Sequence, residues 1–145
     1  MSFKTIISGL ARTPMGGMQG VLSPLSASNL GAYAVKGALE RAGVASGKVD
    51  EVIMGCVLPA GQGQAPARQA AVGAQIPVSV PATTINKMCG SGMKAAMLAH
   101  DNLLAGSHRV MVAGGMEHLY AAKAMGAWNL PVSYTHLTLP TNREV

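Results

Sequence analysis

Aromatic side chains are scarce in this sequence, and its positive charge is not concentrated. Only 3% of the 145 residues are aromatic, with one Trp, three Tyr and one Phe. Proteins that bind nucleic acid usually stack bases on aromatic rings and gather Lys and Arg into patches. Here the net charge of +5 comes from Lys and Arg residues scattered singly between Lys4 and Arg143. We therefore expect no nucleic-acid partner, whereas a phosphorylated small molecule is compatible with the charge.

Long apolar runs and paired cysteines are also lacking. The start, MSFKTIISGL, has one lysine and no apolar run long enough for a signal peptide or a membrane span. The two cysteines, Cys56 and Cys89, are not in a CxxC arrangement, so neither a disulfide framework nor a zinc site is indicated. We expect a cytoplasmic protein with reduced thiols, no membrane contact and no metal.

What the sequence does contain is an alternation of β-prone apolar runs with helical periodicity, in a length that suits one globular unit. The run VDEVIMGCVL is nearly continuous and apolar after Glu51, as expected of a strand buried on both faces. The order βαβαβαβ predicts an α/β fold, a mainly parallel sheet with helices on both faces. The predicted strands are Phe3 to Leu10, Val49 to Leu58, Val78 to Ile85 and Arg109 to Ala113; the predicted helices run from the Ser23-Pro24 start signal to Gly43, from Ala65 to Ala74, and from Gly92 to Ala105 before Gly106.

A thiol lies at one strand-to-helix joint, in the stretch TTINKMCGSGMKAAMLAH. The N–H groups of the first helical turn have no intrahelical partners and would point towards Cys89, favouring its nucleophilic thiolate. Gly90 and Gly92 have no Cβ and would let a thioester approach the backbone. From its position alone, Cys89 is either such a nucleophile or a small hydrophobic side chain. Cys56, inside a strand, is interpreted as structural.

These residues carry a resemblance to a known family. INKMCGSGMKAAMLAH, with PARQAA (Pro66 to Ala71) before it and VAGGMEH (Val112 to His118) after it, resembles the amino-terminal half of the thiolases, in particular bacterial acetyl-CoA acetyltransferases. The opening SGLARTPMGG matches as well, so the resemblance spans residues 3 to 118. It implies a thiolase-like half-fold that takes acetyl-CoA or acetoacetyl-CoA, with Cys89 accepting the acyl group as a thioester. It also implies no cofactor beyond the coenzyme A thioester substrate, and a homo-oligomeric parent, a dimer or a tetramer.

The sequence departs from the family pattern in the groups that would assist Cys89. The family's GHP histidine and CxGGG cysteine belong to a carboxy-terminal half that these residues do not include. His100 lies more than about 15 Å along the helix from Cys89, given a rise of about 1.5 Å per residue, so it is too far for a catalytic hydrogen bond. We expect surface or packing roles for His100, His108 and His118. Three hypotheses stay open: an acyltransferase, a catalytically incomplete fragment of one, or a module that binds coenzyme A or phosphate without turnover.

The composition changes after about Met125. Residues 130–145, LPVSYTHLTLPTNREV, contain neither Gly nor Ala. Within them VSYTHLTLPT resembles one translated frame of a common transposase sequencing adapter. We therefore expect a partial thiolase amino-terminal domain at residues 1–118, a diverging segment at 119–131 and a non-native tail at 132–145, which also holds His136.

Four other features have structural interpretations. GQGQAP, from Gly61 to Pro66, lacks the third glycine of a dinucleotide fingerprint and is expected to be a loop. Gly114 to Glu117 could bound a pocket, but a turn with Glu117 hydrogen-bonded to nearby backbone is favoured. Arg68 could meet a phosphate or an interface carboxylate, but a solvated or interface arginine is favoured. The methionines of the second half are expected to fill core gaps; they are Met88, Met93, Met97, Met111 and Met116.

Overall fold

The computed structural model describes residues 4–17 and 19–118, and they form an α/β unit around a parallel sheet. Three strands, β1 (Glu51–Gly55), β2 (Ala82–Ile85) and β3 (Met111–Gly115), lie in the order β2-β1-β3. Both neighbours pair with β1 in parallel, so that Gly55 lies opposite Ile85 on one side and Gly115 on the other. The segments 119–131 and 132–145, for which divergence and a non-native tail are predicted, lie outside the described residues.

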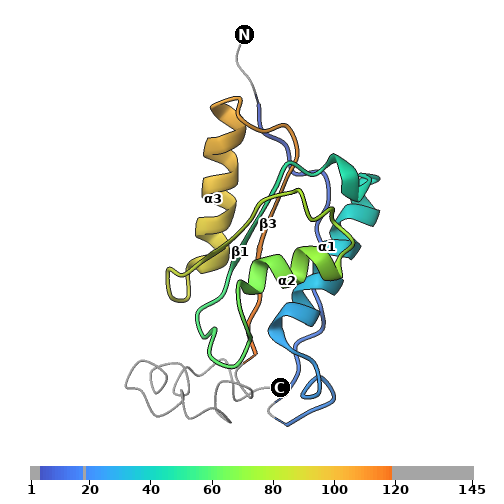
Figure 1. The fold of residues 1–145 in the computed structure, drawn as a ribbon, viewed down its shortest axis with the longest axis vertical. Helices are drawn as coiled ribbons and strands as arrows, with labels where there is room; N and C mark the ends of the chain where they lie inside the picture. Colours follow the sequence, from blue (N-terminus) through green and yellow to red (C-terminus); the bar gives the residue numbers. More distant parts are fainter. Residues whose placement is uncertain (1–3, 18, 119–145) are drawn as a thin grey trace.

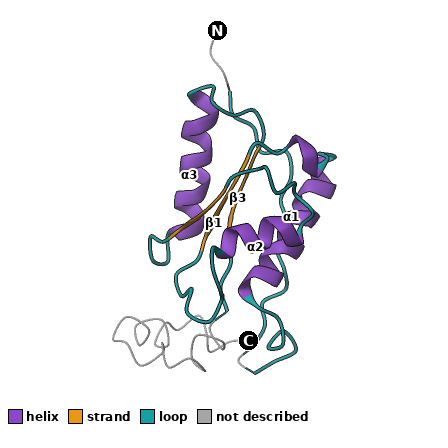
Figure 2. Cartoon of the chain, viewed as in Figure 1, coloured by secondary structure: helices purple, strands orange, loops and turns teal. Residues whose placement is uncertain are grey.

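Helices cover both faces of the sheet, as predicted. The long helix α1 (Ala27–Ala42) and the short α2 (Pro66–Gly73) pack against each other on one face, while α3 (Ser91–Leu104) covers the other and contacts β1 and β3 (Figure 1). A single 3-10 turn, η1 (Ser46–Lys48), leads into β1. The predicted mainly parallel sheet with helices on both faces is confirmed, and Figure 2 shows the loops that join the layers at the two ends of the sheet.

Local signals explain where the helices begin and end. Ser26 caps α1 through a reciprocal pair of hydrogen bonds with Asn29, three residues later than the predicted start at Ser23. Gly43 ends α1 in the left-handed conformation, with φ of 63°, as predicted from the glycine. Pro66 occupies the first turn of α2, where its missing N–H costs nothing. Gly106, with φ of 75°, follows the end of α3.

The predicted first strand is wrong for the described part of its range. Residues 4–10 form no strand and pair with none of the three described strands. The segment instead lies along α1, where Arg41 donates a hydrogen bond to the Leu10 carbonyl at 2.7 Å. Ile6, Ile7 and Leu10 stay exposed. A β-prone run becomes a strand only where another strand offers backbone partners, and no described strand does so here.

The remaining predicted strands are confirmed in place but differ in their bounds; β3 has the predicted length but lies two residues later than Arg109 to Ala113. β1 is confirmed as a buried strand, and it lies in the middle of the sheet, but it covers only half of Val49 to Leu58. The first residues of the predicted Val78 to Ile85 form a turn instead, in which the Val80 N–H donates to the Pro77 carbonyl at 3.0 Å. Paired backbone, rather than apolar composition, therefore sets the strand ends.

The core lies mainly between the sheet and the α1/α2 layer. Val52, Met54 and Cys56 of the central strand region are its largest fully buried side chains. On the other side, α3 buries Ala95 and Ala99 and leaves its outer face uncovered. No helix among residues 4–17 and 19–118 is long and apolar enough to cross a membrane.

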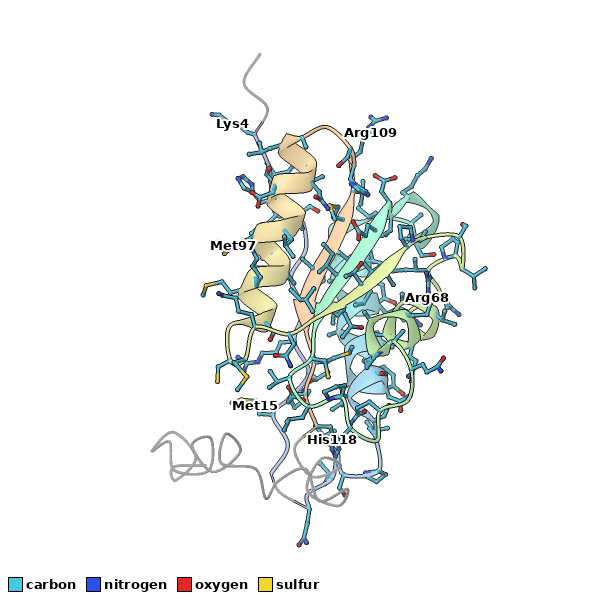
Figure 3. All side chains as sticks on the ribbon, turned by 60° about the vertical axis from the view of Figure 1, so that its left-hand side comes forward. Lys4, Met15, Arg68, Met97, Arg109 and His118 are labelled. Atoms are coloured by element: carbon cyan, nitrogen blue, oxygen red, sulfur yellow. The ribbon has the colours of Figure 1, made fainter. Side chains whose placement is uncertain are left out.

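The prediction that the methionines fill core gaps is wrong for three of the five. Met93 is 73% exposed and Met97 52% exposed, and Met97 projects from α3 in Figure 3. Met88 is also exposed, whereas Met116 is buried and Met111 is partly buried. Met93 and Met97 lie four residues apart on the outer face of α3, and no described element packs on that face.

Candidate active site

The three strands end at the same edge of the sheet, because all of them run in parallel. In open α/β sheets, ligands bind in the crevice outside these carboxyl ends. Cys56 follows β1, Asn86 follows β2 and Met116 follows β3. The predicted nucleophile Cys89 lies at this edge, in the turn between β2 and α3, and it is exposed.

The backbone around Cys89 forms a tight turn that leads directly into α3. The Gly90 N–H donates to the Lys87 carbonyl at 3.1 Å, and the Ser91 N–H donates to the Met88 carbonyl at 3.0 Å. The helix begins at Ser91 with Gly90 as its cap, and no side chain caps it. Free N–H groups at the start of a helix attract an anion or a developing negative charge. The predicted strand-turn-helix joint is therefore present.

Met88, directly before Cys89, has an unusual backbone conformation. Its φ is 47°, in the left-handed region that a non-glycine residue adopts at a cost of roughly 1–3 kcal/mol. Both backbone polar groups of Met88 are held by side chains. Its N–H donates to Asn86 Oδ1 at 2.9 Å, and its carbonyl accepts from Ser91 Oγ at 2.6 Å. Ser91 Oγ also accepts the Lys87 N–H at 2.8 Å.

Glycines at two strand ends let the start of α3 sit directly on the sheet. A Cβ added to Gly55 would lie 2.6 Å from Ser91 Cβ and 2.8 Å from the Gly92 nitrogen. A Cβ added to Gly115 would lie 3.3 Å from Gly92 Cα. The sequence suggests that Gly92 lets a thioester approach the backbone. In the structure, Gly92 instead lets the backbone of α3 itself lie close to the sheet.

Glu117 connects the ends of β1 and β3. Its carboxylate accepts the Val57 N–H at 2.8 Å and the Leu58 N–H at 3.2 Å. Glu117 bonds backbone as expected, but its partners lie about 60 residues earlier in the chain instead of nearby. No sequence signal points to them, because the register of β1 beside β3 brings them together.

Cys56 has the structural role that was predicted for it. The side chain is 2% exposed, and its Sγ lies 3.9 Å from Glu117 Oε1. Burial, followed by the negative charge of Glu117, raises the pKa of the Cys56 thiol to about 11. A thiol that resists ionisation in this way is a poor nucleophile at neutral pH.

A cavity of about 510 Å³ lies beside the same edge of the sheet. The loop from Arg12 to Gly17 forms one wall, and Gly115 to His118 forms the other. Of the residues considered for a pocket, Gly115 to Glu117 line this cavity and Gly114 does not, and Glu117 also makes its backbone contacts. Cys89 is not among the residues that line this cavity.

The histidines make structural or surface contacts, in agreement with the expectation. His100 is exposed on α3. At the opposite end of the sheet, His108 Nδ1 lies 2.8 Å from Ser107 Oγ and its Nε2 lies 3.5 Å from Glu51. His118 is buried, with Nε2 at 3.4 Å from the Leu22 carbonyl.

The remaining sequence predictions concern Arg68, the loop before α2 and a metal site. Arg68, expected to be solvated or at an interface, is partly buried and donates to the Val80 carbonyl at 2.6 Å, which connects α2 to the turn before β2. The loop prediction for Gly61 to Pro66 is correct up to Ala65, since α2 begins at Pro66. Within the described ranges, no three His, Cys, Asp or Glu side chains gather closely enough to hold a metal ion.

Comparisons with known proteins agree with the fold. The family described as thiolase, N-terminal domain, matches residues 5–139. Over 116 residues the chain is 56% identical to the mitochondrial acetyl-CoA acetyltransferase B of Xenopus laevis. Over 117 residues it is 55% identical to the acetyl-CoA acetyltransferase of Cupriavidus necator. The crystal structure of the Acat5 thiolase of Ascaris suum in complex with coenzyme A superposes with a TM-score of 0.78 at 39% identity.

Each of these matches covers most of this chain and a minor part of the relative. The Xenopus match includes 80% of this chain and 28% of the relative, and the Cupriavidus match 81% and 30%. The Ascaris structure is matched over 80% of this chain and 30% of its own. The chain thus spans less than a third of the length of these proteins, and it belongs to the thiolase family through the amino-terminal domain.

Proposed function

We propose that this chain carries the acyl-accepting step of an acetyl-CoA C-acetyltransferase, with Cys89 as the nucleophile. The observation that supports this most is the exposed thiol at the uncapped amino end of α3, at the sheet edge where ligands bind. The relatives named acetyl-CoA acetyltransferase are 55% and 56% identical over this region. The substrate is a coenzyme A thioester, and the step needs no further cofactor.

In this step, the Cys89 thiolate attacks the carbonyl carbon of acetyl-CoA. A new C–S bond forms, and the carbonyl oxygen takes up the electron pair and becomes a tetrahedral oxyanion. When the carbonyl re-forms, the bond to the coenzyme A sulfur breaks and coenzyme A leaves as a thiolate, which takes a proton from solvent. We propose that N–H groups of the first turn of α3 after Ser91, whose own N–H donates to the Met88 carbonyl, stabilise this negative charge.

Formation or cleavage of acetoacetyl-CoA would follow as a second step. A base must then remove an α-proton from a second acetyl group, and donors must hold the resulting enolate. The resemblance implies that those groups belong to the carboxy-terminal half of the family. We therefore propose that this chain accepts an acetyl group without completing the cycle. Turnover of acetoacetyl-CoA with coenzyme A by the 145-residue chain would contradict this.

Acetyl transfer can be tested directly. The chain is incubated with acetyl-CoA, digested and analysed by mass spectrometry, and we expect one acetyl group on the peptide that contains Cys89. Neutral hydroxylamine should remove it, because a thioester is cleaved while an amide is not. Cys89→Ser should abolish the thioester and Cys56→Ala should keep it. Acetylation confined to lysines, or no acetylation at all, would contradict the proposal.

A second candidate function is supported by the cavity beside the glycine-rich loop. Arg12 lines this cavity of about 510 Å³ and offers a guanidinium to a phosphate. If the chain is a binding module without turnover, the Cys89→Ser variant should bind coenzyme A as tightly as the wild type does. The Arg12→Met variant should bind it less tightly. Calorimetric titration of the three proteins separates this candidate from the first.

Location and assembly are proposed at the level of the parent protein. We infer a cytoplasmic protein that forms a homo-oligomer, a dimer or a tetramer, when the whole enzyme is present. The exposed side chains of Met93, Met97 and Leu104 on α3 support association, because large apolar groups on one helix face are usually covered. Sedimentation of the full-length enzyme would test the oligomeric state.

A further inference from the structure

The geometry points to Asn86 and Ser91 as positioning residues for Cys89, acting by holding Met88 in its left-handed conformation. This inference rests on the proposed role of Cys89 and deepens it. It starts from the fact that a non-glycine residue keeps a positive φ only where surrounding contacts determine it. At Met88, with φ of 47°, those contacts come from the two side chains.

The two side chains hold opposite ends of the same residue. Asn86 Oδ1 accepts the Met88 N–H at 2.9 Å, and Ser91 Oγ donates to the Met88 carbonyl at 2.6 Å. Ser91 Oγ at the same time accepts the Lys87 N–H at 2.8 Å, so one hydroxyl group closes the turn on both sides. Neither side chain needs to touch a substrate for this function.

Both side chains are themselves fixed by the sheet. Ser91 is 4% exposed and packs on Gly55, the last residue of β1. The Asn86 Nδ2 group donates to the Val57 carbonyl at 3.1 Å, and the Val57 N–H donates to Glu117 at 2.8 Å. A chain of hydrogen bonds thus runs from the end of β3, through the loop after β1, to the residue before Cys89.

Loss of the hydrogen bonds to Met88 should slow the reaction of Cys89 with a reagent instead of accelerating it. The thiol is already exposed, so a looser turn gains little access for a reagent. A looser turn does let Cys89 sample several positions, so its sulfur is less often in the one position that the folded turn before α3 presents. Asn86 is exposed, so its replacement leaves the core intact.

The test measures the rate of iodoacetamide alkylation at Cys89 in the full chain, read by peptide mass spectrometry. Asn86→Ala should lower the rate about fivefold, the size expected for one ordinary hydrogen bond. Asn86→Asp keeps an acceptor for the Met88 N–H and loses the donor to the Val57 carbonyl, so its rate should lie between those of the wild type and Asn86→Ala. Asn102→Ala is the matched control, because it removes an amide that bonds Glu51 at the far end of α3. Its rate should equal that of the wild type.

A compensating substitution separates positioning from general destabilisation. Glycine adopts positive φ without strain, so Met88→Gly should restore most of the rate lost in Asn86→Ala. The inference is overturned if this double variant stays slow, if Asn86→Ala and Asn102→Ala slow the reaction equally, or if Asn86→Ala speeds it. If circular dichroism shows that Asn86→Ala does not fold, amide hydrogen exchange of the wild-type chain tests the inference instead. The Lys87 and Met88 amides should exchange at least about tenfold slower than in an unfolded chain, and exchange at the unfolded rate would refute the hold.

Failure of the proposed function gives a different result. If acetyl-CoA leaves no thioester on Cys89 while the alkylation rates follow the pattern above, the positioning inference stands and the acyltransferase proposal fails. If the thioester forms and Asn86→Ala alkylates like the wild type, the function stands and the inference fails.

Discussion

Replacing Gly55 by alanine should displace the start of α3 from the sheet and destabilise the fold. The new methyl group would lie 2.6 Å from Ser91 Cβ, 2.7 Å from the Ser91 carbonyl carbon and 2.8 Å from the Gly92 nitrogen. Two of these three atoms are backbone, so no side-chain rotation relieves the overlap. The helix as a whole must shift, and the turn that carries Cys89 must shift with it.

The expected loss of folding free energy follows from substitutions that overpack protein cores. Extra methyl groups forced into packed sites destabilise by typically 1–3 kcal/mol, and the backbone contacts place Gly55→Ala at the upper end, about 3 kcal/mol. For a chain of this length, that loss lowers the melting temperature by about 10 °C. The measurement is thermal unfolding followed by circular dichroism, with a urea titration as an independent estimate of the free energy of unfolding.

Gly47→Ala is the matched control, because a Cβ at Gly47 meets nothing within 4 Å. Its melting temperature should stay close to the wild-type value. Gly55→Ala should also alkylate more slowly at Cys89 than Gly47→Ala does. Equal melting temperatures for the two variants would refute the argument that Gly55 is required by the close approach of α3.

Three further predictions concern ionisable groups. Glu117→Gln should lower the free energy of unfolding by about 1.5 kcal/mol in a urea titration, because a charged acceptor of two backbone N–H groups becomes neutral; an unchanged midpoint would argue against the link between β1 and β3. Hydrogen bonds from the Val110 and then the Arg109 N–H hold the pKa of Asp50 below its usual 3.8, so the stability it contributes is present above that pH and lost as the pH falls further. The difference in urea midpoint between wild type and Asp50→Asn should therefore shrink below pH 3.8, and a difference independent of pH would contradict the assignment. Because burial and Glu117 raise the pKa of Cys56 to about 11, iodoacetamide at pH 7 should alkylate Cys89 on the order of 100-fold faster than Cys56. Comparable rates at the two thiols, measured by peptide mass spectrometry, would show that Cys56 is not shielded.

Features that depend on a few consecutive residues could be predicted from the sequence. A glycine in the left-handed conformation ends α1, and a proline in the first turn starts α2, because caps and turns are decided within about five residues. The position of Cys89 between a β-branched run and a helical run is of the same kind, so the strand-turn-helix joint was found without the structure. The βα alternation then predicts a parallel sheet, since each crossover returns the chain in the same direction.

Features that depend on distant partners could not be predicted in this way. Residues 4–10 have strand-forming composition but no described strand to pair with, and Met93 and Met97 have helical core spacing but no described layer above them. Glu117 finds its partners about 60 residues earlier, where the register of β1 and β3 places them. Periodicity tells which side chains share a face, whereas burial and hydrogen bonding require knowing what lies opposite that face.

The sequence by itself therefore determined the helices, the parallel sheet and the location of a thiol at a helix start. Only the tertiary structure decided how that thiol is held. Asn86 and Ser91 close the turn around Met88, Gly55 admits Ser91 against β1, and Glu117 connects the ends of the outer and central strands. The physical reason is that local sequence sets backbone preference and periodicity, while a strained turn persists only through contacts that folding brings from other strands.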